Sequence, residues 1–187
     1  LQREIKHLHD NLGITVIYVT HDQEEAMVMS DRVCLMNEGR IEQIGSPSEL
    51  YFQPKSIFAA DFLGESNLFA GKVVRQAAEG ITIERADGVA VSGICDDQVS
   101  DGETVHYMIR PENIRVSLDK GSEENFARGK LKETIMIGQL TKYFLELADE
   151  SELVATTLTG SHRGSLQDGD EVFFGWSTSD ARIMLGS

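Results

Sequence analysis

The sequence has 187 residues, of which 41% are hydrophobic, and its 17 Lys and Arg residues against 31 Asp and Glu residues give a formal net charge of −14. This acidity disfavours binding to nucleic acid or to an anionic membrane surface, because both are polyanions that repel the chain. The longest apolar run, residues 14–19, is far shorter than the roughly 18–20 residues that a membrane-spanning helix needs.

The first part of the chain alternates helical and strand-like patterns. Three apolar residues at helical spacing predict a helix over residues 1–12. The β-branched run of residues 14–20 predicts a strand that is buried on both faces, as in a parallel sheet. Asp22, followed three residues later by Glu25, predicts the capped start of a second helix. Helix, strand, loop and helix in this order are typical of an α/β domain.

A β-hairpin is predicted next. Residues 32–36 and 40–44 flank Asn37-Glu-Gly39, in which the glycine would accept a positive φ. Cys34 alternates with apolar neighbours, so we expect it in the core. The chain has one other cysteine, Cys95, and no CxxC motif, which indicates a reducing, cytoplasmic compartment.

Two short helices complete this part of the chain. Ser46 and Glu49 form a capping box with Pro47 at the first helical position, and that helix should end before Pro54. A further helix is predicted over residues 57–63, with Gly64 as its C-cap.

After Gly64 the pattern becomes rich in strands. Short alternating segments are separated by Asp-Gly and Glu-Gly pairs, and such spacing predicts a small barrel or sandwich with Trp176 in its core. We expect a flexible loop over residues 119–125, and no internal repeat is apparent. The predicted strands cover residues 68–76, 80–86, 89–94, 104–110, 113–117, 129–147, 152–159, 171–177 and 181–185.

Several motifs occur together in the order of one protein family. Residues 13–26, Gly-Ile-Thr-Val-Ile-Tyr-Val-Thr-His-Asp-Gln-Glu-Glu-Ala, resemble the region around the switch histidine of ABC transporter ATPases. Residues 108–114, Met-Ile-Arg-Pro-Glu-Asn-Ile, resemble the Arg-Pro-Glu signature of the OB-type domain called TOBE, which follows the ATPase domain in one importer subfamily. Residues 169–176 resemble the last strands of that domain. Further similar stretches are residues 30–33, 36–47, 49–51 and 58–64.

The resemblance implies two domains. Residues 1–64 would be the C-terminal part of an ABC nucleotide-binding domain, an α/β remnant of the ATPase fold. Residues 65–187 would be an all-β OB-fold-like (TOBE) barrel with a regulatory role. Because the chain begins without methionine and in mid-pattern, we expect further residues upstream of Leu1 in a parent protein.

Within this family the chain is most similar to importers of the polyamines putrescine and spermidine. The junction Gly64-Glu-Ser-Asn67 and the turn of residues 137–140 carry this similarity. Importers of iron, sugars and other solutes share much of the pattern.

The resemblance assigns the central role to His21. Hydrolysis of ATP needs a glycine-rich phosphate loop with lysine, a metal ion, a carboxylate that activates water, and a donor at the γ-phosphate. The sequence has no Gly-x-x-x-x-Gly-Lys-Ser/Thr motif. His21 follows the predicted strand and precedes a helix N-terminus, where its imidazole can donate to a phosphate oxygen. By resemblance it is the switch histidine that contacts the γ-phosphate of ATP; the alternative is a histidine satisfied within a strand–helix turn.

The intact parent is implied to be an ABC-type ATPase that uses ATP with Mg²⁺. It would form a homodimer on transmembrane permease subunits at the inner face of the cell membrane, with a solute-binding protein as an indirect partner. The chain alone is expected to be inactive and to hold no cofactor, since it lacks the phosphate loop. No metal is expected either, since His7 and His9 point to different faces of their helix and cannot form an i, i+4 metal pair. The alternative function is an OB-type module that binds a small ligand or a protein partner.

Three other groups of polar residues are open to two interpretations. Asp22, Glu24 and Glu25 could act as acid or base catalysts, but capping and helix-dipole stabilisation are the preferred roles. Residues 110–112, Arg-Pro-Glu, either touch a ligand or partner or form a salt bridge that fixes a turn. Residues 161–164, Ser-His-Arg-Gly, form a polar loop that could contact a ligand.

Overall fold

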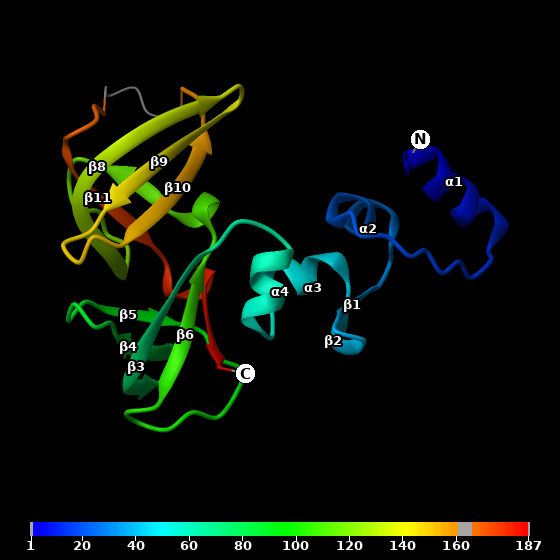
Figure 1. Ribbon diagram of the computed structural model, residues 1–187, viewed down its shortest axis with the longest axis horizontal. Helices are drawn as coiled ribbons and strands as arrows, with labels where there is room; N and C mark the ends of the chain where they lie inside the picture. The colour runs from blue at the N-terminus through cyan, green and yellow to red at the C-terminus, as the bar shows by residue number, and fades with distance from the viewer. Residues whose placement is uncertain (1, 161–165, 187) are drawn as a thin grey trace. The chain divides into compact units, whose positions relative to one another are not determined.

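The structure is a computed structural model that describes residues 2–160 and 166–186. The chain divides into two compact units, Leu1–Gly64 and Glu65–Ser187, which Figure 1 shows as a unit of short helices with one hairpin and a unit made mainly of strands. Among the described residues, no helix is both long enough and apolar enough to cross a membrane.

The first unit consists, in its described part, of short helices and one hairpin. Most of these elements begin and end within one or two residues of their predicted bounds, which confirms the local patterns. Leu35, Leu50, Ala59 and Leu63 form its small buried core. The elements are α1 (Gln2–Leu12), α2 (Gln23–Met29), β1 (Val33–Asn37), β2 (Arg40–Gly45), α3 (Pro47–Phe52) and α4 (Ile57–Phe62).

The predicted buried strand over residues 14–20 does not form. This segment joins no sheet, and the side chains of Ile17 and Val19 are 89% and 90% exposed. A buried parallel strand needs a hydrogen-bonded neighbour on each side. The two strands that the structure describes in this unit, β1 and β2, pair with each other. The parallel α/β arrangement expected for residues 1–64 is therefore not seen.

The caps of the two later helices show how local sequence sets helix ends. Ser46 and Glu49 form the predicted capping box, with the Ser46 N–H donating to Glu49 Oε2 at 2.7 Å. This bond from the Ser46 backbone lowers the pKa of the Glu49 carboxyl. Helix α4 begins with Ser56 as its cap and ends with Leu63 as its C-cap, one residue before the predicted Gly64.

In the hairpin of β1 and β2, Cys34 is exposed, whereas the sequence predicted it in the core. Its turn places Glu38 and Gly39 at φ values of 49° and 77°, the left-handed pair of a type I′ turn. Leu35 lies in the core and Cys34 is exposed. Adjacent residues of a strand point to opposite faces, so only one of the two can be buried. The apolar neighbours of Cys34 did not reveal which face that would be.

The second unit contains two five-stranded antiparallel sheets within its described residues. The first has the order β12-β6-β3-β4-β5, and the second has the order β10-β9-β8-β11-β7. Ile94, directly after β5, pairs with the backbone of β12, which joins the two edges of the first sheet and closes it. The elements are β3 (Asn67–Ala77), β4 (Gly80–Glu84), β5 (Ala90–Gly93), β6 (Thr104–Ile109), η1 (Pro111–Asn113), β7 (Arg115–Ser117), β8 (Asn125–Ile137), β9 (Leu140–Glu146), β10 (Glu152–Leu158), β11 (Glu171–Trp176), η2 (Thr178–Asp180) and β12 (Ala181–Leu185).

Most of these strands match the predicted ones, with one clear difference. The single strand predicted over residues 129–147 is two strands, β8 and β9, because Gly138 turns the chain with a φ of 60°. Strand β8 also begins earlier than predicted, at Asn125, which had been expected in a flexible loop.

The second unit is built from an internal repeat, so the prediction of no repeat was wrong. The run β3-β4-β5-β6-η1-β7 is followed by the run β8-β9-β10-β11-η2-β12. Each run forms four strands of one sheet, and its last strand crosses to the other sheet: β7 pairs with β11, and β12 pairs with β6. The two repeats are therefore interlocked by an exchange of their final strands.

Hydrogen bonds at equivalent positions show which residues of one repeat align with which residues of the other. Val73 N–H donates to Glu103 O at 2.9 Å, and Leu131 N–H donates to Asp170 O at 2.8 Å. The register of β3 with β4, and of β8 with β9, shifts directly after Val73 and Leu131. The sequences that then align are Asn67-Leu-Phe-Ala-Gly-Lys-Val73 with Asn125-Phe-Ala-Arg-Gly-Lys-Leu131, and Asp101-Gly-Glu-Thr-Val105 with Asp168-Gly-Asp-Glu-Val172.

The glycine shared by the two aligned strands has a physical cause. A Cβ atom on Gly71 would lie 2.9 Å from the carbonyl oxygen of Glu84, and one on Gly129 would lie 2.2 Å from that of Glu146. Both contacts are too close for a real Cβ atom. Each repeat therefore needs glycine where its first long strand meets the next one.

Two buried asparagines at equivalent positions connect the repeats. The Asn67 Nδ2 group donates to Val154 O at 2.8 Å, and the Asn67 Oδ1 atom accepts the Val154 N–H at 2.6 Å. Asn125 makes the same pair of bonds with the backbone of Ser92, at 2.9 and 2.6 Å. A carboxamide carries both a donor and an acceptor, as a peptide group does. Each asparagine side chain therefore makes the two hydrogen bonds that a backbone peptide group would make with a strand of the other repeat.

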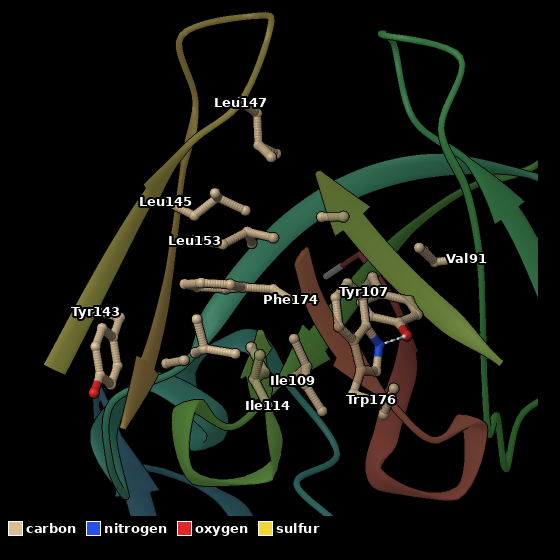
Figure 2. Close-up of a cluster of buried hydrophobic side chains, with 14 of the residues drawn as sticks. Val91, Tyr107, Ile109, Ile114, Tyr143, Leu145, Leu147, Leu153, Phe174 and Trp176 are labelled. Atoms are coloured by element: carbon tan, nitrogen blue, oxygen red, sulfur yellow. Dashed lines mark hydrogen bonds between the residues drawn. The ribbon is translucent and has the colours of Figure 1, made fainter. Parts of the chain in front are cut away.

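One hydrophobic core lies between the two sheets. Figure 2 shows Tyr107 of β6 beside Trp176 and Phe174 of β11, with the indole nitrogen of Trp176 directed at the tyrosine hydroxyl. That Nε1–H donates to Tyr107 Oη at 2.7 Å, and the tyrosine hydroxyl donates to Ser92 O at 2.9 Å. Burial raises the pKa of Tyr107, so its hydroxyl stays protonated and keeps donating. The predicted core position of Trp176 is confirmed.

Replacing either asparagine by alanine should destabilise the second unit to a similar extent. In Asn67→Ala or Asn125→Ala, a partly buried backbone N–H and C=O lose their amide partner, which costs about 1–3 kcal/mol of unfolding free energy. Urea unfolding followed by Trp176 fluorescence measures the loss. The matched control is Gln76→Ala, which removes an exposed amide bonded to Asp101 and should cost less than about 0.5 kcal/mol. Equal effects of all three variants would contradict the assigned role.

Tyr107→Phe should also destabilise the second unit, because it leaves the buried Trp176 N–H without its acceptor. We expect a loss of about 1–3 kcal/mol. The pair Tyr107→Phe and Trp176→Phe tests the contact itself: in the double variant no donor is orphaned, so the combined loss should be smaller than the sum of the two single losses. Urea unfolding followed by far-UV circular dichroism measures all three variants, and strict additivity would rule out the coupling.

Candidate functional site

His21 lies in the loop between the extended segment 14–20 and helix α2. Its side chain is exposed. It contributes to a shallow, open depression lined by His21, Asp22, Gln23 and Phe62, all of which belong to the first unit.

Helix α2 starts directly after His21 and is capped by Asp22. The Asp22 side chain accepts the Glu25 N–H at 3.2 Å, as the capping prediction required. The reciprocal half of the predicted capping box does not form. The Asp22 N–H donates instead to Thr20 Oγ1 at 2.9 Å, and the Glu25 carboxylate accepts from other groups.

The Glu25 carboxylate faces the segment that leads into His21. Its Oε2 atom accepts the Thr20 hydroxyl at 2.6 Å and the Tyr18 hydroxyl at 2.9 Å. The bond to Glu25 raises the pKa of Tyr18, because ionising the phenol would place a second negative charge beside the carboxylate. Glu25 is therefore a hydrogen-bond acceptor within the loop, which is a different role from either capping or acid–base catalysis.

Sequence reasoning missed Tyr18 and Thr20 as parts of this site. Both belong to the β-branched and aromatic run that predicted a buried strand, so they were assigned no role in the loop. One signal was present: residues 18 and 20 of an extended segment share a face, and both can reach one side chain of the following helix.

Two of the side chains that line the depression, His21 and Gln23, carry hydrogen-bond donors. An imidazole N–H can donate to an anionic oxygen such as that of a phosphate. The depression is lined by no lysine or arginine, and its Asp22 carboxylate would repel a polyphosphate. In the part of the chain that the structure describes, no group of three or more His, Cys, Asp or Glu side chains could hold a metal ion. The depression therefore offers hydrogen-bond donors, but no lysine or arginine, to an anionic ligand.

The other candidate residues lie elsewhere. Arg110 is buried, and its guanidinium donates to Glu65 O at 3.2 Å and to Ser66 Oγ at 2.6 Å. It thus fixes the first residues of the second unit, which argues against a direct ligand contact. The predicted polar loop at residues 161–164 lies outside the described residues.

The comparison with known proteins finds matches to the TOBE domain in the second unit and to longer relatives over the whole chain. Residues 107–184 match the family model of the TOBE domain. The spermidine/putrescine import ATP-binding protein of Rubrobacter xylanophilus is 36% identical over 188 residues, covering 100% of this chain and 49% of that protein. The protein of the same name from Thermotoga maritima is 40% identical over 190 residues, covering 97% of this chain and 51% of its own length. The chain spans about half the length of the curated relatives that it matches.

A solved structure shares the fold. The cytoplasmic molybdate-binding protein ModG, in a form with molybdate bound, has a TM-score of 0.58 and covers 64% of this chain and 95% of its own. At 16% sequence identity this likeness concerns the fold alone. Recognition of a small ligand or a protein partner by the second unit therefore stays a prediction.

These comparisons confirm the resemblance found in the sequence. The structure is mostly β-sheet and has a TOBE/OB-like fold. The chain is a homologue, over its whole length, of the ATP-binding proteins of spermidine/putrescine import, and it carries their C-terminal TOBE region.

Proposed function

We propose that this chain is the C-terminal part of the ATP-hydrolysing subunit of an ABC importer, and that the intact subunit powers uptake of a polyamine such as putrescine or spermidine. The observation that carries the proposal is the alignment of the whole chain with proteins named for that import and for ATP binding. The exposed His21, in a loop whose neighbouring residues are held by hydrogen bonds, is consistent with it, because a nucleotide site needs a donor at the γ-phosphate.

Residues 1–64 are, on this proposal, the C-terminal part of the nucleotide-binding domain. The apolar side chains that they expose support it. Ile17 and Val19 are almost fully exposed. Met36 and Ile41, on the outer face of the hairpin, are more than half exposed. Burying one such side chain is worth about 1.5–3 kcal/mol, so these surfaces gain stability when further parts of a domain cover them. Residues 65–187 form the regulatory domain.

His21 contacts the γ-phosphate of ATP in the intact subunit. Its N–H donates to a phosphate oxygen on which negative charge builds during hydrolysis, so the bond strengthens as the reaction proceeds. Mg²⁺ supplies further charge neutralisation when it is bound with ATP. The remaining groups of the site, which include the phosphate loop, belong to other parts of the subunit.

The proposal also defines an assembly. Two copies of the intact subunit form a dimer that binds ATP, docks on transmembrane permease subunits and stays at the cytoplasmic face of the membrane. A solute-binding protein delivers the polyamine to the permease. The acidic surface of this chain, with its formal charge of −14, supports attachment through protein partners, because an anionic lipid surface would repel it.

Full-length protein carrying His21→Ala should lose ATP hydrolysis. Removal of one preorganised donor to a developing charge lowers kcat by about 100-fold or more, while ATP binding changes little. Phosphate release by the purified protein and uptake of labelled putrescine by cells that depend on it are the two measurements. The matched control is His7→Ala, an exposed histidine on α1, which should leave both unchanged. Full hydrolysis by His21→Ala would refute the assigned role.

The 187-residue chain alone should hydrolyse no ATP. It carries one donor of the site and no phosphate-binding loop. Phosphate release at high protein concentration, compared with a buffer blank and with full-length protein, checks this. Turnover above the blank that persists through repeated purification would contradict the prediction.

A further inference from the structure

We propose that Glu25 is a positioning residue for His21, acting through the hydroxyl of Thr20. This inference rests on the proposed function, since it concerns the γ-phosphate contact of the same histidine. It adds a residue that neither touches ATP nor transfers a proton, and that sets the path of the backbone through His21.

The first step is the turn that encloses His21. Thr20 Oγ1 accepts the N–H of Asp22, two residues further along the chain, at 2.9 Å. This is a hydroxyl-closed turn in which a side chain takes the place of a backbone acceptor, with His21 as its central residue. Such turns are weak when the hydroxyl can rotate freely, because its lone pairs are then not held toward the N–H.

The second step is what holds that hydroxyl. A threonine hydroxyl has one proton, and here it is donated to Glu25 Oε2 at 2.6 Å. With the proton directed at Glu25, a lone pair of the oxygen remains for the Asp22 N–H. Thr20 and Glu25 are both partly buried, which strengthens the pair relative to one in open solvent.

The third step is a second bond to the same carboxylate. Tyr18 Oη donates to Glu25 Oε2 at 2.9 Å, so the segment before His21 is attached to the helix after it at two points. On the other side, Asp22 is held by the N–H of Glu25 that it caps. The residues on both sides of His21 are therefore fixed, while its own imidazole stays exposed to a ligand.

This arrangement matters because the backbone path through residues 20–22 sets the position of the His21 imidazole. A donor contributes to catalysis only if it is held near the position of the reacting oxygen before the reaction begins. A carboxylate that accepts two hydroxyl groups from the preceding segment is well suited to hold the loop.

The test compares variants of full-length protein in which each bond is removed or kept. Glu25→Ala and Thr20→Val should each lower kcat about tenfold or more and change the KM for ATP less than about twofold. Glu25→Gln keeps an acceptor and Thr20→Ser keeps the hydroxyl, so both should restore most of the turnover. The double variant Thr20→Val with Glu25→Ala should be no slower than the slower single variant, since both break one turn.

The matched control is Glu24→Ala, which removes an exposed carboxylate from the same helical turn and should leave kcat and KM unchanged. Thermal unfolding of each variant shows whether Glu25→Ala folds; if it does not, Thr20→Val and its rescue by Thr20→Ser carry the test. If His21→Ala abolishes hydrolysis while Glu25→Ala and Thr20→Val match the wild type, the positioning role is overturned and the proposed function stands. If His21→Ala has no effect on hydrolysis, the role assigned to His21 fails and this inference fails with it, whereas a full-length wild-type protein that hydrolyses no ATP would refute the proposed function.

Discussion

The reciprocal amide bonds of Asn67 and Asn125 are the constraint on which the second unit depends. Each asparagine supplies a donor and an acceptor to a strand of the opposite repeat, at Val154 and at Ser92. Each repeat also gives its last strand to the other sheet. Neither repeat can therefore complete its own sheet, and the shared core closes only when both are in place.

The first unit depends on different interactions. Its buried core is small, and its longest β-branched run is exposed, so burial of apolar surface does little to place the loop of His21. Hydrogen bonds from side chains do this instead: the Asp22 cap, the Thr20 turn and the Glu25 carboxylate. A loop held in this way can keep its local geometry while the elements around it differ.

Much of the fold could be predicted from the sequence, because the features concerned are local. Ser46, Pro47 and Glu49 specify a helix start through contacts within one turn, and the structure shows the complete capping box. Alternating strands and Asp-Gly turns gave most of the β-strands of the second unit. His21 was singled out from the residues around it in sequence; the structure places it in a loop before helix α2, and its role stays a prediction.

The sequence by itself determined the helices and most strands, since each of these depends on neighbours within a few residues. It also determined the family, through several motifs that occur in one order along the chain. Only the tertiary structure decided which face of β1 is buried, that residues 14–20 join no sheet, that the second unit is an interlocked repeat, and that Glu25 holds Thr20 and Tyr18. Those features require partners that lie on other elements, at Val154 and Ser92 for the two asparagines. Spacing along the chain does not encode such partners, and they are set when the elements pack together.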